Sequence, residues 1–521
     1  MGASQSFFRL PFRSPPKHER DEFDLAIIGA GPTGLLAAVL ARQLNLDTIV
    51  LDAKDAPLSV GGADAITART QQYLESASTT YADGEFTSRQ PTWWNNIPHT
   101  FYNTLLMIGQ PFIERHLASY LDIPVHYSEP VISLSHDQGP HQTAIIRTAN
   151  RTIKAKYCLA ADGAKSFVRN ELGIGWEGTK PNMVWAVLDC WIESTFLLAK
   201  EIITLQIDGQ SRMAWIPRER GMQRFYILLD GEITLEKAQA EVRRHMAPHP
   251  VEFTHIEWFS KFEIKERVAS TFLYPTPAGP YILAGDSAHV HSVNGGQGMN
   301  TGLSDAFNLI WRIALLIKYP SLPLATQTAL LKSYDTERRS SAKEVVDVAA
   351  KLVRSTTAEA KHYVELIQKN SGFITGMGVK YTGLESECVR ESERSLFKAG
   401  ERCPDLWLQE ESGASSRLYQ KLRYGRYLLL VIGNDACINK KFKGEFVTVI
   451  RLKPLQAKAI GVEKQSEKED THENAYRKDA FGSAYVKRDE EYLVLVRPDC
   501  YTEFVGGVDE VLQYFNERYP I

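Results

Sequence analysis

The sequence predicts an α/β multidomain protein that begins with a dinucleotide-binding unit. An apolar strand, a glycine-rich turn, a helix and a second strand follow one another between Phe23 and Leu51. Strand-like segments dominate residues 181–275, and helical periodicity returns after Gly302 and runs, with breaks, to about Gln368. The chain has 521 residues, a length typical of roughly two to four domains.

The first strand and helix meet at a GxGxxG motif, Gly29-Ala30-Gly31-Pro32-Thr33-Gly34. The first glycine permits a tight turn, the second lets the backbone approach a pyrophosphate, and the third lets helix and strand pack closely. The helix N-terminus then offers N–H groups to the phosphates. Asp52 ends the second strand, where a carboxylate can accept hydrogen bonds from ribose hydroxyls. We therefore expect a dinucleotide at Gly29, Gly31, Pro32, Thr33, Gly34 and Asp52; the alternative is a plain tight turn.

Changes of pattern divide the chain into six segments. We expect a disordered tail over residues 1–21, and a linker rich in glycine, serine and charge over 371–400. A sheet-rich domain at 181–275 separates two parts of the nucleotide domain, 22–180 and 276–370. A compact unit follows at 401–521, with strands expected at 427–432, 447–452 and 492–496, a charged solvated loop at 464–472 and a helix at 508–514.

Composition excludes several classes of protein. The net charge of −3 gives no support for a nucleic-acid partner. The six cysteines are scattered, without a CxxC pair or metal-ligand spacing, so we expect reduced thiols, no metal and a cytoplasmic protein. No apolar run reaches the ~18 residues that a membrane span requires. The first six residues fit the MGxxx[ST] pattern, so acylation of Gly2 is an alternative to a plain tail, although one acyl chain anchors only marginally.

Two later motifs separate FAD from NAD. The first is Ala161-Asp162-Gly163, which continues to Arg169. The second is Leu283-Ala284-Gly285-Asp286-Ser287-Ala288-His289, followed by Gly295-Gly296-Gln297-Gly298-Met299-Asn300. With these motifs the chain resembles the group A flavoprotein monooxygenases, and within them the phenol hydroxylase branch. The resemblance covers nearly everything from residue 22 onward.

The resemblance implies a Rossmann-like FAD-binding domain of the p-hydroxybenzoate hydroxylase type, a sheet-rich substrate domain and a thioredoxin-like C-terminal domain that lacks CxxC and serves packing or dimerisation. It implies FAD as cofactor, NAD(P)H and O2 as co-substrates, and oxygen transfer through a flavin C4a-hydroperoxide. A homodimer stays open. The FAD contacts that it implies, besides the GxGxxG residues, are Arg69, Gln110, Asp162, Asp286, Gly296, Gln297, Gly298, Met299 and Asn300. His289 and His291 are expected to be polar loop residues.

Three further residues match the phenol site of that branch. Arg224 and Tyr226 lie two apart on an expected strand, so both side chains point to one face and Phe225 to the other. Together with Asp64 they are expected to surround a phenolic oxygen. Tyr226 and Asp64 would withdraw the phenol proton, and Arg224 would stabilise the negative charge that develops. The alternative is an ordinary Asp–Arg ion pair that supports the sheet.

Some positions depart from the family pattern. Val293 and Ser340 stand where the family frequently has proline, and Val293 leaves the shape of the substrate loop open. Trp215-Ile216-Pro217 matches only part of the flavin halogenase motif, because Met213 stands at its first tryptophan. The alternatives to phenol hydroxylation are a Baeyer–Villiger or epoxidising monooxygenase, a non-catalytic flavin-binding partner protein, and an NAD-dependent dehydrogenase.

Overall fold

The computed structural model describes residues 21–69, 78–82, 85–90, 106–138, 142–196, 202–208, 210–292, 296–356, 360–409, 415–433, 446–452 and 491–520. The predictions for the N-terminal tail with Gly2, for Val293 and for the charged loop at 464–472 fall outside these residues. Within the described ranges, no helix combines the length and apolar character needed to cross a membrane. The same ranges hold no group of histidine, cysteine and acidic side chains arranged to ligate a metal.

The nucleotide domain is built on an eight-stranded sheet with a parallel centre. Its main path runs β18-β19-β10-β1-β2-β7, and β8 and β9 continue from β10. β2 is wholly buried, and the C-terminal ends of β1 and β10 are buried apolar runs, as expected where a sheet is covered on both faces. The strands are β1 (Glu22–Ile28), β2 (Thr48–Leu51), β7 (Val125–His126), β8 (Val131–His136), β9 (Ala144–Thr148), β10 (Thr152–Ala160), β18 (Leu273–Tyr274) and β19 (Tyr281–Leu283).

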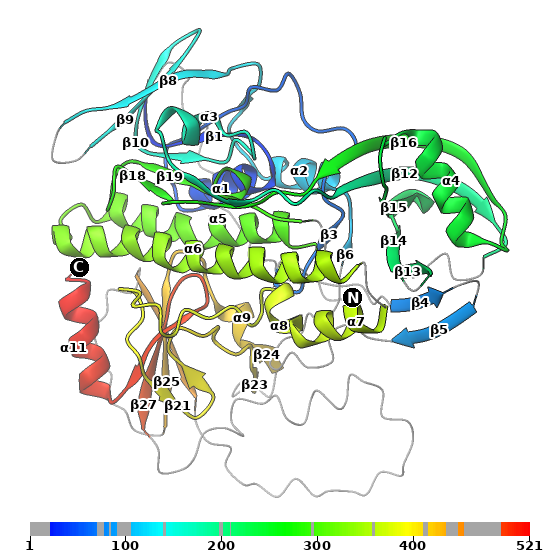
Figure 1. Ribbon diagram of the computed structural model, residues 1–521. Helices are drawn as coiled ribbons and strands as arrows, with labels where there is room; N and C mark the ends of the chain where they lie inside the picture. Colours follow the sequence, from blue (N-terminus) through cyan, green and yellow to red (C-terminus); the bar gives the residue numbers. More distant parts are fainter. Residues whose placement is uncertain are drawn as a thin grey trace, which may run out of the picture.

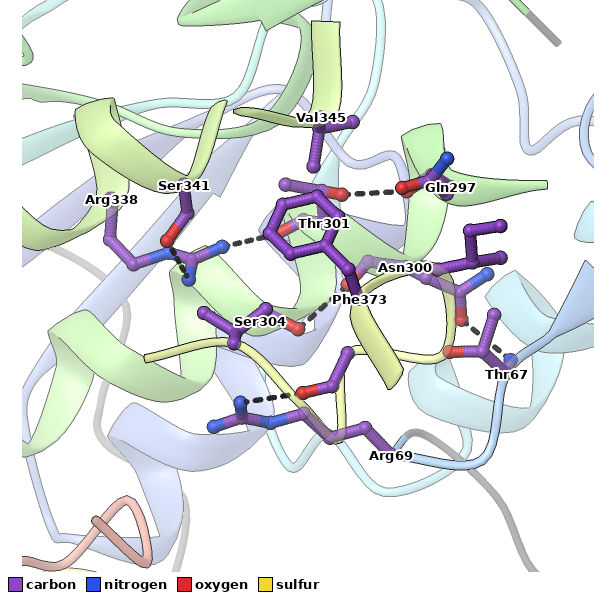
Figure 2. A pocket seen from close by; sticks show the side chains of 13 residues that line it. Thr67, Arg69, Gln297, Asn300, Thr301, Ser304, Arg338, Ser341, Val345 and Phe373 are labelled. Carbon is purple, nitrogen blue, oxygen red and sulfur yellow. Dashed lines mark hydrogen bonds between the residues drawn. The ribbon is translucent and has the colours of Figure 1, made fainter. Parts of the chain in front are cut away.

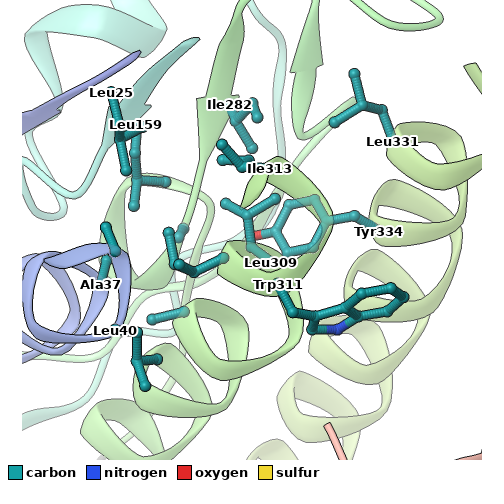
Figure 3. Close-up of a cluster of buried hydrophobic side chains, with 14 of the residues drawn as sticks. Leu25, Ala37, Leu40, Leu159, Ile282, Leu309, Trp311, Ile313, Leu331 and Tyr334 are labelled. Carbon is teal, nitrogen blue, oxygen red and sulfur yellow. The ribbon is translucent and has the colours of Figure 1, made fainter. Parts of the chain in front are cut away.

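Helix α1 (Pro32–Gln43) packs against this sheet together with the long helices α5 (Gln297–Lys318) and α6 (Leu324–Ser355) (Figure 1). Leu25 and Leu159 from the strands meet Ala37 of α1 and Leu309 of α5 in one buried cluster (Figure 3). Since these residues come from both predicted parts of the nucleotide domain, the two parts share a single core. Two short helices complete it, α2 (Gln110–Ala118) and α3 (Phe167–Glu171).

The sheet-rich domain is a seven-stranded sheet in the order β16-β12-β15-β14-β13-β4-β5. Helix α4 (Leu235–Met246) packs on it, and Phe225, Trp215 and Val242 lie in the core between them. Two of the strands come from residues 78–90, so the sheet extends beyond the predicted 181–275 segment. The strands are β4 (Ser78–Ala82), β5 (Glu85–Gln90), β12 (Val184–Ser194), β13 (Ile202–Ile207), β14 (Gln210–Pro217), β15 (Gln223–Leu228) and β16 (Val251–Glu263).

Small elements join the two domains. A three-stranded sheet runs β11-β17-β20, and a two-stranded sheet pairs β3 with β6. Both carry site residues or lead directly into them, as described below. The elements are β3 (Ala65–Ile66), β6 (Leu106–Met107), β11 (Trp176–Thr179), β17 (Glu266–Ala269), β20 (His289–Val290) and the short helices η1 (Glu219–Gly221) and η2 (Gly285–Ser287).

The C-terminal domain has the thioredoxin-like strand order β26-β25-β27-β28. β25 runs parallel to β26 and antiparallel to β27, and β28 is antiparallel to β27. Three strands lie where the sequence predicts them: β25 (Tyr427–Ile432), β26 (Val447–Leu452) and β27 (Tyr492–Val496). The closing helix α11 (Val508–Arg518) begins as predicted and continues past residue 514, and β28 (Thr502–Gly506) was not predicted.

The segment expected to be a linker, 371–400, is a packed part of the molecule. Tyr381 and Cys388 are fully buried, and Phe397 is 2% exposed. Its glycine, serine and charged residues coexist with apolar anchors that pack on the C-terminal domain. The small elements around it are α7 (Ala360–Lys369), α8 (Ser371–Ile374), β21 (Glu393–Arg394), β22 (Phe397–Lys398), β23 (Trp407–Gln409), β24 (Ser415–Arg417) and α9 (Leu418–Lys421).

A buried ion network holds the C-terminal domain against α5 and α6 (Figure 1). Glu337 on α6 accepts two hydrogen bonds from Arg497, at 2.6 and 2.9 Å, and one from Arg312 on α5 at 2.9 Å. Arg497 also donates to Asp499, and all four side chains are fully buried. Charges without solvent require such partners, so the position of the C-terminal domain is tied to the two helices.

Candidate active site

The three glycines of the GxGxxG turn serve different purposes. Gly29 has φ +104°, and a Cβ there would lie 2.3 Å from the Ala161 carbonyl oxygen. A Cβ on Gly34 would lie 1.9 Å from the carbonyl oxygen of Gly29. A Cβ on Gly31 would meet no atom of the described residues within 4 Å. The chain's own packing therefore explains Gly29 and Gly34, whereas the space at Gly31 is open in front of the N-terminus of α1, where a pyrophosphate fits.

The neighbours of the glycines support the turn. Pro32 opens α1, and Thr33 lies against the backbone of Gly285 and Gly302, because a Cβ on either would come within 2.7 or 2.3 Å of its hydroxyl oxygen. The carboxylate of Asp52 accepts the Ala30 N–H at 2.6 Å and the Lys54 N–H at 2.8 Å. Asp52 thus fixes the turn at the end of β2 and keeps lone pairs for ribose hydroxyls.

Asp286 interrupts a buried stretch of chain. Gly285 and Ser287 are buried, but the Asp286 side chain between them is exposed. Asp305 fixes the short helix η2 that carries Asp286: it accepts hydrogen bonds from the Gly285 N–H at 2.9 Å and from His289 at 2.7 Å. A carboxylate presented outward from such a rigid turn is free to accept hydrogen bonds from a polyol such as the ribityl chain of FAD.

Asp162 lies two residues after the end of β10. Its Oδ2 accepts the Val168 N–H at 3.1 Å, and its buried Oδ1 has no partner within the described residues. Burial raises the pKa of Asp162. Buried polar atoms are normally hydrogen-bonded, so the free Oδ1 marks a place where a ligand can donate.

The N-terminus of α5 presents an unpaired amide. Gly296 caps the helix with φ +62°. Gln297 is 2% exposed, and neither of its amide atoms has a hydrogen-bond partner among the residues that the structure describes. Asn300 accepts the Thr67 N–H at 2.9 Å and donates to the Ala65 carbonyl at 3.0 Å, which joins α5 to β3. Figure 2 shows Gln297, Asn300 and Thr67 around one pocket. Met299 lies beside them, half-buried, and a Cβ at Gly298 would come no closer than 3.8 Å to the His291 ring.

Arg69 and Gln110 hold the short segment around β3, Gln110 through Ala63 and Arg69 at the other end. Arg69 donates to the Gly376 carbonyl at 3.2 Å and to the Tyr501 hydroxyl, and its guanidinium lies 4.7 Å from the Tyr501 ring centroid. Gln110 accepts the Ala63 N–H at 3.0 Å and donates to Glu114 at 2.8 Å. Arg69 therefore faces the C-terminal domain as well as the pocket of Figure 2.

Asp64, Arg224 and Tyr226 converge although 160 residues separate the first from the other two along the chain. The Tyr226 hydroxyl donates to Asp64 Oδ2 at 2.8 Å, and Arg224 Nη1 lies 3.5 Å from the same oxygen. Arg224 Nη1 also donates to the Tyr226 oxygen at 3.3 Å and to the Gly62 carbonyl at 2.6 Å. Phe225 points the other way, into the core of the sheet domain. Burial, and after it the Asp64 charge, raises the pKa of Tyr226.

Asp189 is a member of this cluster that the sequence analysis missed. It lies on β12 directly across from Arg224 on β15 and binds that guanidinium through two hydrogen bonds of 2.6 Å. Asp189 is the lone charged residue in the apolar run 184–192, which was the available signal, but the register of the strands was needed to name its partner.

The two histidines of the later motif are both buried: His289 lies on β20, and His291 lies in the loop that directly follows it. His289 is 1% exposed and pairs with Asp305. His291 is 7% exposed, its Nδ1 bonds the Ser292 carbonyl at 2.8 Å, and burial lowers its pKa to about 4. His291 is therefore neutral at physiological pH.

Comparison with known proteins agrees with this geometry. Residues 22–349 match the family described as FAD binding domain. The chain is 26% identical over 452 residues to a 3-hydroxybenzoate 4-monooxygenase of Comamonas testosteroni, covering 73% of this chain and 69% of the relative. It is 28% identical over 462 residues to the phenol 2-monooxygenase fsqG of Aspergillus fumigatus, covering 80% and 76%.

Solved structures share the fold. The flavin-dependent monooxygenase PieE, in complex with FAD and substrate, superposes with a TM-score of 0.71 at 16% identity, covering 95% of this chain and 98% of that one. Aklavinone-11 hydroxylase, in a ternary complex with FAD and aklavinone, also gives 0.71 at 18% identity, covering 97% and 99%.

The chain belongs to the FAD-binding family of group A aromatic hydroxylases, and it is an FAD-dependent monooxygenase. The residues present fit the cofactor: open space at Gly31, an outward carboxylate at Asp286, and unpaired buried atoms on Asp162 and Gln297.

Proposed function

We propose that this monooxygenase hydroxylates a phenolic ring, with NAD(P)H as reductant and O2 as oxidant. The observation that carries the proposal is the Asp64–Tyr226–Arg224 cluster, since an aromatic ring that receives electrophilic oxygen reacts best when its hydroxyl is losing a proton. The names of the relatives support the same substrate class, because two of them are hydroxybenzoate and phenol monooxygenases.

FAD would be held at Gly31, Asp52 and Asp286, with Asp162 and Gln297 supplying their unpaired atoms. When bound and reduced, FAD supplies the electrons that activate O2 as an electrophilic oxygen donor. The N-terminus of α5 would direct its positive dipole end toward the flavin ring, where negative charge accumulates on reduction.

Tyr226 would act as the first proton acceptor for the substrate. Its oxygen can accept the phenol hydrogen while its own hydrogen passes along the 2.8 Å hydrogen bond to Asp64. The raised pKa of Tyr226 means that the residue stays neutral at rest. Tyr226 would therefore relay the proton, and Asp64 would receive it.

Arg224 would stabilise the phenolate-like charge. Its Nη1 lies 3.3 Å from the Tyr226 oxygen and 3.5 Å from Asp64, and the side chain is wholly buried. In a site screened from water, a fixed positive charge beside developing negative charge has a larger effect than in solution.

The test is Tyr226→Phe, which removes the relaying hydroxyl and keeps the ring. We expect FAD binding to persist and hydroxylation of phenol and 3-hydroxybenzoate to slow by about 10²–10⁴-fold, the usual contribution of general acid–base groups. NAD(P)H consumption would continue with more hydrogen peroxide released. The readouts are product by mass spectrometry, NAD(P)H oxidation by absorbance, and peroxide.

Tyr274→Phe is the matched control, because Tyr274 lies on β18 at the edge of the nucleotide-domain sheet. We expect it to behave like the unaltered chain. An unchanged rate and unchanged coupling in Tyr226→Phe would refute the relay.

A further inference from the structure

Two buried charged residues, Asp189 and Arg218, lie behind the proposed phenol site and take no part in the proposed reaction. Asp189 on β12 and Arg224 on β15 are paired residues of neighbouring antiparallel strands, 1% and 0% exposed. Arg218 approaches Asp189 from behind at 3.7 Å and is itself paired with Glu219 at 3.1 Å. Asp189 therefore lies between two guanidinium groups, with Arg224 on one side and Arg218 on the other.

Asp189 determines which way Arg224 points. Its two carboxylate oxygens take Nε and Nη2 of the guanidinium, both at 2.6 Å, which is the bidentate geometry of strong Arg–carboxylate pairs. Only Nη1 is left for the Gly62 carbonyl, the Tyr226 oxygen and Asp64. The two hydrogen bonds to Asp189 therefore fix the plane of the Arg224 guanidinium, and Nη1 is the nitrogen directed toward the proposed position of the substrate oxygen.

A competition between two carboxylates gives this arrangement a chemical consequence. Asp64 lies 3.5 Å from Arg224 Nη1, too long for a strong hydrogen bond, whereas both contacts to Asp189 are 2.6 Å. Without the Asp189 charge, Arg224 would have Asp64 as its remaining carboxylate partner and would be drawn to it. A carboxylate fully engaged by a guanidinium is a weaker proton acceptor.

Among the described residues, the groups facing the site come from several elements. They are Asp64 from the loop before β3, Asp189 from β12, Arg218 and Glu219 just after β14, Arg224 and Tyr226 from β15, and the Trp258 ring of β16, 5.3 Å from the Arg224 guanidinium. Removing the Asp189 charge makes this set more positive.

We propose that Asp189 is a positioning residue that draws Arg224 away from Asp64, keeps Asp64 able to accept the substrate proton, and limits the positive charge felt by the phenolic oxygen. The inference rests on the proposed function, because it assigns that same site to a phenol.

The probe is 4-nitrophenol bound to the holoenzyme, since its phenol and phenolate forms absorb at different wavelengths. In Asp189→Asn we expect the bound probe to ionise at a pH lower by about one unit, the effect of one charge over ~10 Å at an effective dielectric constant of ~20. Hydroxylation of phenol would nevertheless slow about tenfold, with more peroxide, because Arg224 would engage Asp64, the acceptor of the substrate proton. Asp189→Glu would recover part of the rate.

Glu129→Gln is the matched control. It removes the charge from another buried carboxylate that Arg151 binds at 2.8 and 2.7 Å, near β7 in the nucleotide domain. We expect no change in probe ionisation or turnover. Unchanged ionisation and turnover in folded Asp189→Asn would overturn the inference.

The double variant Asp189→Asn/Arg224→Gln keeps the test decisive if Asp189→Asn alone does not fold, because it removes both buried charges. If Asp189 acts through Arg224, the turnover rate of the double variant should lie within about twofold of the rate of Arg224→Gln alone. A turnover rate far below that of Arg224→Gln would overturn the inference. If Tyr226→Phe and Asp64→Asn leave hydroxylation unchanged, the proposed function fails. If they impair it while Asp189→Asn does nothing, only this inference fails.

Discussion

Acidification should loosen the C-terminal domain through Glu337. Burial alone would raise the pKa of this carboxyl, but Arg497 and Arg312 outweigh it and lower the pKa from its ordinary 4.5 to about 2. A lowered folded-state pKa contributes stability above the unfolded pKa and loses it as pH falls. The difference between the unfolded and folded pKa values corresponds to about 3 kcal/mol of stability above pH 5, of which about 2 kcal/mol is gone by pH 3.

The perturbation that isolates this term is Glu337→Gln. It leaves Arg312 and Arg497 facing each other without their shared carboxylate, so we expect a loss of about 3–5 kcal/mol at pH 7. Urea unfolding, followed by tryptophan fluorescence at several pH values, measures the free energy of unfolding; Trp311 lies 4.5 Å from the Arg312 guanidinium and reports on the network.

The difference between the unaltered chain and Glu337→Gln should shrink as the pH falls from 5 to 3. Glu344→Gln, on the exposed side of the same helix, is the control and should change the free energy of unfolding by less than about 0.5 kcal/mol. A difference that stays constant across this pH range would refute the assignment of a strongly lowered pKa to Glu337.

Two further predictions concern the cofactor. Gly31→Ala should leave the stability of the apoprotein unchanged or raise it by up to about 1 kcal/mol, because φ is −79° and the new methyl meets nothing, yet weaken FAD binding at least about tenfold. Gly34→Ala, with its Cβ 1.9 Å from a carbonyl oxygen, should instead destabilise the chain by about 3 kcal/mol. Thermal unfolding measures the stability of both variants, and titration with FAD measures their affinity for the cofactor. An FAD affinity in Gly31→Ala equal to that of the unaltered chain would contradict the prediction for Gly31. Asp286→Asn should weaken FAD binding by about 1–3 kcal/mol without changing apoprotein stability, since the side chain is exposed; an unchanged dissociation constant in fluorescence titration would count against a ribityl contact.

The local pattern of apolar and polar residues predicts the positions of individual strands. Strands β25 and β27 begin and end where the sequence predicts them, because each is a short apolar run bounded by turn residues. The ends of helices are harder to predict: α1 ends at Gln43, since Asn45 takes φ +62° and turns the chain toward β2. Such ends depend on a single backbone conformation, which periodicity does not report.

The same pattern does not predict which segments far apart in the sequence pair with each other. β4 joins the sheet domain by pairing with β13, more than 100 residues later in the chain. Tyr381 and Cys388 make the segment 371–400 a packed one, although its composition is polar. In both cases the partner lies in another part of the fold, and nothing in the local sequence identifies it.

The site shows the same division. Motifs and family resemblance named Asp64, Arg224 and Tyr226, and the structure brings these three side chains together. Asp189 carries no motif, because its position depends on the register of β12 against β15. The partner of Arg69, Tyr501 in the C-terminal domain, was equally hidden, since 432 residues separate them.

One segment, residues 61–69, joins all the parts that oxygen transfer must align. Gly62 and Asp64 bind Arg224 and Tyr226 of the sheet domain, Thr67 binds Asn300 at the start of α5, and Arg69 binds the C-terminal domain. Reacting atoms must approach to roughly 3–3.5 Å, and errors of about 1 Å are costly. A short segment anchored at both ends gives less room for such errors than two domains aligned by their outer surfaces. The position of a phenol relative to the flavin would therefore depend on this segment more than on the rest of the domain interface.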